Sequence, residues 1–122
     1  MTMSLRIGKI DGFTYPKSFL KTIELNLIDF DLWYLMDEAQ VLQKMEGLQK
    51  RYPKRQLIPF ARRDDNDDFS CFEVGKGERV YIIHDFSSEG YEQRREYEDF
   101  WQWLEAAVGE MIEYNKEELR GE

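Results

Sequence analysis

The stretch FSCFEVGKGERVYIIHDF, residues 69–86, decides the fold. Its two halves are rich in aromatic and β-branched residues, and the glycine-containing segment Gly75–Glu78 separates them, which is typical of a β-hairpin. With a loop of two or four residues, Cys71 lies opposite Ile82. Because side chains alternate along a strand, one face then carries Phe69, Cys71, Glu73, Val80, Ile82 and His84.

Shorter patterns on both sides of the hairpin predict the remaining elements. Leu57–Ala61 is apolar but contains a proline, which favours an edge strand. Two helices precede it: one begins near Pro16, with Thr14 as a candidate cap, and ends near Asn26. The second follows Asp37, which forms a capping box with Gln40. Apolar residues at helical spacing predict a last helix that begins between Arg95 and Glu98 and ends near Lys116.

These elements define a fold class. The chain has 122 residues, a length typical of one domain, and it contains no internal repeat or linker. Helices at the N-terminal side, paired strands in the middle and a helix at the end are characteristic of α+β proteins. We therefore predict a single α+β domain, residues 1–122, with a small antiparallel sheet and a long C-terminal helix packed on it.

Composition excludes several functions. The net charge is −8, from 25 acidic and 17 basic residues, which argues against a nucleic-acid binder and against binding to anionic membranes. No apolar run reaches the ~20 residues of a membrane span. Met1–Phe13 lacks the apolar core of a signal peptide, and a lone cysteine fits a reducing compartment. We expect a cytoplasmic protein without a cofactor or a metal.

The charge is unevenly distributed along the chain. Residues 1–63 hold 11 basic and 7 acidic side chains, whereas residues 64–122 hold 6 basic and 18 acidic ones. The sign changes abruptly at Arg62-Arg63, which are followed by Asp64-Asp65-Asn66-Asp67-Asp68. Such an asymmetry indicates electrostatic recognition of a partner, although acidic helix faces are often only solvated.

The acidic cluster admits three interpretations. Its first five residues have the spacing of a calcium-binding EF-hand loop, but the sixth position is Phe69 instead of glycine and the twelfth is Gly75 instead of glutamate. This argues against an EF-hand, while weak binding of a divalent ion by the four carboxylates stays open. The cluster is then either a turn shaped by its own side chains and paired with the two arginines, or a contact surface for a basic partner. Both roles can coexist.

The remaining candidate residues are one cysteine, one histidine and three tryptophans. On the expected hairpin register, Cys71 and His84 are diagonal neighbours, so a thiolate–imidazolium pair is conceivable, but a buried thiol and a structural histidine are the simpler interpretation. Trp101 and Trp103 are two positions apart on a helix, so one is expected in the core and the other outside it. Trp33 fits either the core or an aromatic contact site.

An ordered set of motifs in this chain resembles the SUKH superfamily, which includes the fungal Smi/Knr cell-wall regulators and many bacterial immunity proteins. The resemblance runs from about Tyr15 to Met111 and is strongest over residues 57–104. It rests on LIPFARR (57–63), the acidic cluster, FSCFE (69–73), VYIIHDF (80–86), GYE (90–92) and FWQWL (100–104).

The resemblance implies a curved, mainly antiparallel sheet surrounded by helices and a binding module that is not an enzyme. Bacterial relatives of this kind neutralise toxins, often nucleases, by direct contact. A partner-binding surface is then expected at Arg62, Arg63, Asp64, Asp65, Asn66, Asp67, Asp68 and Trp33.

The alternative is a regulatory module that binds a small molecule or peptide in an aromatic cleft near Trp33, Phe60 and Tyr81. A third hypothesis is an enzyme that uses Cys71 and His84.

Overall fold

A six-stranded antiparallel sheet forms the centre of the molecule. The computed structural model describes residues 10–121, and its strands follow one another in the sheet in the order β1-β2-β3-β4-β5-β6. Strands that are neighbours in the sheet are also consecutive in the chain, and loops join all of them except β2 and β3, between which a helix is inserted. The strands are β1 (Asp29–Phe30), β2 (Trp33–Leu35), β3 (Leu57–Arg63), β4 (Asp68–Glu73), β5 (Val80–His84) and β6 (Gln93–Tyr97).

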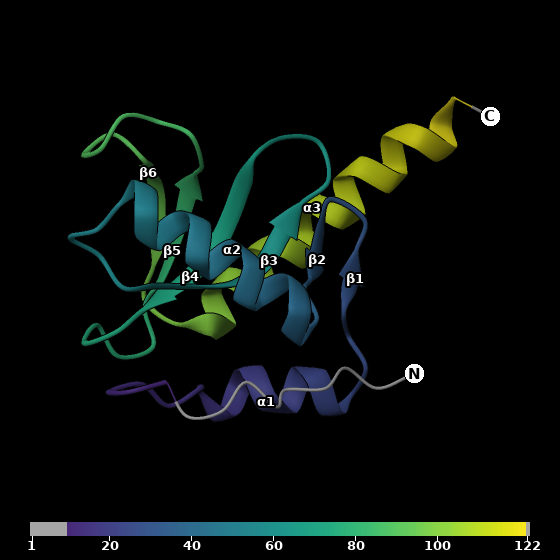
Figure 1. Cartoon of the computed structure of the whole chain (residues 1–122). Helices are drawn as coiled ribbons and strands as arrows, with labels where there is room; N and C mark the ends of the chain where they lie inside the picture. Colours follow the sequence, from purple (N-terminus) through teal and green to yellow (C-terminus); the bar gives the residue numbers. More distant parts are fainter. Residues whose placement is uncertain (1–9, 122) are drawn as a thin grey trace.

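Helices cover both faces of the sheet (Figure 1). The helices α1 (Lys17–Glu24) and α3 (Phe100–Arg120) pack on one face, and α2 (Glu38–Arg51) packs on the other. The far end of α3 projects beyond the sheet (Figure 1). The predicted α+β domain, with N-terminal helices and a long C-terminal helix on an antiparallel sheet, is confirmed.

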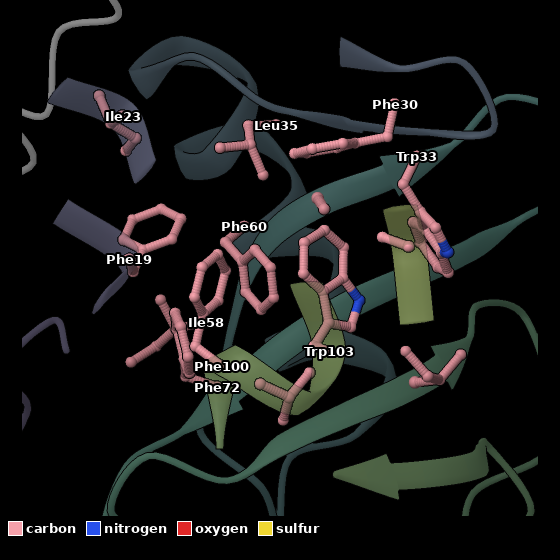
Figure 2. Packing of buried hydrophobic residues seen from close by; sticks show 14 residues of the cluster. Phe19, Ile23, Phe30, Trp33, Leu35, Ile58, Phe60, Phe72, Phe100 and Trp103 are labelled. Carbon is pink, nitrogen blue, oxygen red and sulfur yellow. The ribbon is translucent and has the colours of Figure 1, made fainter. Parts of the chain in front are cut away.

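An aromatic cluster fills the layer between the sheet and the α1/α3 pair (Figure 2). The rings of Phe60 and Phe72 stack with their centroids 4.5 Å apart, and Trp103 of α3 approaches Phe60 at 5.0 Å. Aromatic pairs of this kind add to the stabilisation that burial alone provides. Trp103 is buried and Trp101 is exposed, as predicted for two tryptophans on one helix.

The hairpin register predicted from the sequence is wrong by one residue. Cys71 lies opposite Tyr81, and Ser70 lies opposite Ile82. Continued to the loop, this register leaves the odd number of residues Val74–Glu78 between the strands, whereas the prediction assumed an even number. Gly75 and Gly77, with φ of 83° and 63°, supply the left-handed conformations of that loop. Because of this shift of one residue, side chains of the two strands that were predicted to share one face of the sheet lie on opposite faces.

The predicted position of the proline-containing strand is also wrong. β3 lies inside the sheet, between β2 and β4. Pro59 is tolerated there because a β-bulge lies directly beside it: the register shifts between Pro59 and Ala61, so that Phe60 has no residue opposite. Phe60 and Ala61 consequently both belong to the core on the α1/α3 side.

The predicted helix caps and helix ends are confirmed in part. The capping box of Asp37 and Gln40 is present, as predicted, at the start of α2. Thr14 does not cap α1, whose N-cap position is Pro16. The last helix begins later and ends later than predicted, because residues 93–97 form β6 and Asp99 caps Phe100–Arg120.

Within residues 10–121, none of the helices has both the length and the apolar character of a membrane span. The prediction about a signal peptide concerns Met1–Phe13, most of which lies outside the described residues.

Candidate functional site

Two acidic turns meet at one end of the sheet, beside α3. The β1–β2 turn and the β3–β4 loop are joined by a hydrogen bond in which the Asp64 amide donates to the Leu32 carbonyl at 2.9 Å. Asn115 of α3 donates to the Asp31 carboxylate at 2.5 Å. Figure 1 shows both loops next to α3. We call the exposed carboxylates of the two loops the acidic rim: Asp29, Asp31, Asp64, Asp65 and Asp67.

Arg63 fixes the β3–β4 loop to α3. Its Nε donates to Asp65 Oδ1 at 2.7 Å and its Nη1 donates to Glu110 Oε2 at 2.8 Å, while its guanidinium lies over the Trp33 ring at 5.4 Å. Burial alone would lower the pKa of Arg63, but the hydrogen bonds to Asp65 and Glu110 outweigh it and raise that pKa. Arg63 is predicted from the sequence to lie in a partner-binding surface. Its contacts with Asp65, Glu110 and Trp33 give it a structural role instead.

Asp68 differs from the other members of the acidic cluster because it is buried, at 7% exposure. Its backbone amide donates to Asn66 Oδ1 at 2.7 Å, which closes the turn. Its carboxylate accepts a hydrogen bond from His84 Nδ1 at 2.8 Å and lies 3.5 Å from Arg94 Nε. Asp68 therefore positions the loop from inside, whereas Asp64, Asp65 and Asp67 remain exposed.

Arg62 and Trp33 complete the predicted surface, and they have different environments. Arg62 is exposed, and its guanidinium lies 5.9 Å from the centre of the Tyr34 ring. Trp33 is only 4% exposed and contacts Trp103 in the core (Figure 2). Of the eight residues predicted from the sequence, a partner could reach Arg62, Asp64, Asp65, Asn66 and Asp67 without rearrangement.

The predicted neighbourhood of Cys71 and His84 is wrong. The observed register places His84 opposite Asp68, on the α3 side, whereas Cys71 belongs to the cluster under α2. Burial raises the pKa of the Cys71 thiol well above its ordinary value. The two side chains therefore cannot form a nucleophile–base pair.

The aromatic cleft predicted near Trp33, Phe60 and Tyr81 is also wrong. Trp33 and Phe60 lie in the core on the α1/α3 face, and Tyr81 lies in the core under α2. All three are buried. In residues 10–121, no group of three or more histidine, cysteine, aspartate or glutamate residues is placed to hold a metal ion.

Several residues at this end of the molecule are not predicted from the sequence as part of the site. Asp29 and Asp31 are far from the acidic cluster in sequence and reach it only because β2 pairs with β3. Glu110 reaches it through Arg63. The one available signal is the turn-forming sequence Asp29-Phe30-Asp31, in which the Asp31 amide donates to Asp29 Oδ1.

Comparisons of the chain with protein-family models, with curated proteins and with solved structures find no match. Function is therefore inferred from the residues and contacts of the chain itself.

Proposed function

We propose that the protein is a non-enzymatic binding module whose acidic rim docks onto a basic patch of a protein partner. The observation that carries this proposal is the gathering of five exposed carboxylates from two chain segments at one end of the sheet. Among the described residues, Asp65 alone of the five forms an ion pair, with Arg63. Asp31 accepts a hydrogen bond from Asn115, but none of the four carboxylates other than Asp65 has a cationic partner within residues 10–121, so their charge can meet an external one.

The rim is held rigidly, which favours recognition over mere solvation. Hydrogen bonds from Asp64 to Leu32, from Asn115 to Asp31 and from Asp68 to Asn66 fix the turns that present the carboxylates. Pre-positioned charges lose little side-chain or loop entropy on binding. Complementary charge also accelerates encounter with a basic partner and suppresses wrong partners.

The chemistry of the partner follows from this surface and from the resemblance to the SUKH superfamily. Nucleases and other proteins that bind nucleic acids are basic around their binding sites. A rim of aspartates is suited to cover such a site and exclude the substrate. We therefore propose an immunity-type role, in which the chain neutralises a basic toxin by direct contact.

Co-expression with toxin-like reading frames adjacent to the gene tests the role, and binding measured against salt concentration tests the mechanism. The rim variant D29N/D64N/D67N removes three carboxylates that form no ion pair in the described chain and leaves Asp68 in place. We expect association on the order of tenfold slower at low ionic strength and a shallower salt dependence. The control E24Q/E46Q/E117Q makes the same charge change on three helices and should bind normally.

Two results contradict the proposal in different ways. If the rim variant protects cells and binds with an unchanged salt dependence, the acidic rim is not the docking surface. If no adjacent reading frame is toxic, or if co-expression with this chain never restores growth, the immunity role is wrong whatever the rim does.

A further inference from the structure

A groove with a volume of about 710 Å³ runs beside α3 on the α1/α3 face of the sheet. Its volume falls within the range of small-molecule sites, ~300–1,000 Å³. Trp33, Ile82 and Tyr97 provide apolar lining, and Arg94 and Arg95 of β6 provide positive charge. The five carboxylates of the acidic rim do not line this groove, but Asn66 and Asp68, which shape the β3–β4 loop, and Glu110 of α3 do.

A β-bulge directs both arginines into the groove. Ile82 lies opposite Arg95 and Ile83 lies opposite Gln93, so Arg94 is the extra residue of β6. In a regular strand, two consecutive side chains point to opposite faces. Because a bulge re-aims side chains, Arg94 and Arg95 both line the same groove.

The hydrogen-bonding capacity of these two arginines is largely unused. Arg95 donates to the Tyr97 hydroxyl at 3.2 Å and, within residues 10–121, forms no ion pair with a carboxylate. Among the described residues, the one ion pair of Arg94 is with Asp68, at 3.5 Å, and Asp68 already accepts a shorter bond from His84. Each guanidinium offers five N–H donors in a planar fork. By contrast, Arg63 in the same groove is occupied by Asp65 and Glu110.

We propose that the groove binds an anionic small molecule, whose phosphate or carboxylate group is held by Arg94 and Arg95 and whose apolar or aromatic body lies against Tyr97 and Ile82. The guanidinium fork matches the oxygens of both anionic groups in a two-point contact. The exposed carboxylates of the acidic rim are screened by salt, whereas the two guanidinium groups contact the anion directly, so the rim weakens binding without preventing it.

Calorimetric titration with four probes separates the parts of this site: inorganic phosphate, phenyl phosphate, benzoate and benzyl alcohol. We expect saturable binding of phenyl phosphate, weaker binding of inorganic phosphate and none of benzyl alcohol. The comparison of phenyl phosphate with benzoate identifies which anionic group is preferred. Equal affinity for phosphate and phenyl phosphate overturns the apolar part of the site.

The double variant R94Q/R95Q should bind phenyl phosphate at least about tenfold more weakly, since it removes both charged donors. Both side chains are exposed, so the fold should persist, which the thermal transition checks. The control K116Q/R120Q removes the same charge at the projecting end of α3 and should bind normally. Undiminished binding by R94Q/R95Q, or no saturable binding of any anionic probe at millimolar concentration, overturns the proposal.

Discussion

Arg51 and Asp85, 34 positions apart in the sequence, form a two-point ion pair. Arg51 Nε and Nη2 each lie 2.6 Å from a different oxygen of Asp85, whose side chain is only 3% exposed. The guanidinium also lies over the Phe86 ring at 4.2 Å and against Gly47, where a Cβ would lie 2.7 Å from Arg51 Nη2. The end of α2 is thereby tied to the loop after β5.

Replacement of Arg51 by methionine should destabilise the fold strongly. Met keeps much of the apolar stem but leaves the Asp85 carboxylate buried without its cation. Removing one partner of a buried ion pair costs about 3–5 kcal/mol. Because the Arg51 side chain is 31% exposed, we expect about 2–3 kcal/mol at pH 7 by urea unfolding.

The matched control is Lys50→Met, in the same turn of α2. Lys50 pairs with Glu46 at 3.3 Å on an exposed surface, so its replacement should change the free energy of unfolding by less than about 0.5 kcal/mol. Similar losses for both variants would show that the Arg51–Asp85 pair does not stabilise the fold as described.

Ser70→Ala tests a polar contact inside the core. The indole Nε1 of Trp103 donates to Ser70 Oγ at 2.7 Å, and both residues are buried. Alanine leaves the indole N–H without an acceptor, which costs about 1–3 kcal/mol. Urea unfolding followed by tryptophan fluorescence measures this loss. Ser88→Ala, on the exposed loop after β5, should be neutral, and a neutral Ser70→Ala would show that the bond contributes nothing.

Elements with strong periodic patterns could be predicted from the sequence. The stretches that form α2, β4 and β5 combine apolar spacing with caps or turns, and all three exist. β6, with the sequence QRREY, was missed because it is an exposed edge strand with one apolar residue. β1 and β2 were missed because two and three residues are too few to show a period.

The candidate site was harder to predict than the fold because it depends on pairing between distant strands. The acidic cluster was evident in the sequence, but one residue of hairpin register decides that Asp68 faces His84 and that Cys71 does not. The groove arginines were overlooked because Arg94 and Arg95 share a surface only through a bulge. Neither a loop length nor a bulge leaves a periodic signal in the sequence.

Tyr15 should make the fold sensitive to alkaline pH. Burial raises the pKa of Tyr15 from 10.0 to about 12. The folded state therefore prefers the neutral phenol more strongly than the unfolded state does. The resulting stabilisation is fully present below pH 10 and is lost as the pH rises from about 10 to about 12.

Tyr15→Phe should reduce that alkaline loss, measured as the urea midpoint between pH 8 and pH 11. The variant should also be more stable by about 1 kcal/mol at pH 7, because no residue among 10–121 hydrogen-bonds to the buried hydroxyl. Tyr91, which is 82% exposed, offers the control Tyr91→Phe. Identical pH profiles for wild type and Tyr15→Phe would exclude this tyrosine as the source of the effect.

Cys71 should be inert in the folded protein and reactive in the unfolded one. The thiol is fully buried under α2, and burial raises its pKa, so thiolate is scarce and reagents cannot reach it. Iodoacetamide at pH 8 should modify Cys71 only as fast as the domain opens, and at a rate that rises steeply through the urea transition. The destabilised variant Ser70→Ala should react faster in proportion to its larger unfolded fraction. Rapid alkylation of the native protein, at the rate of a free thiol, would contradict the burial of Cys71 and reopen the hypothesis of a nucleophilic cysteine.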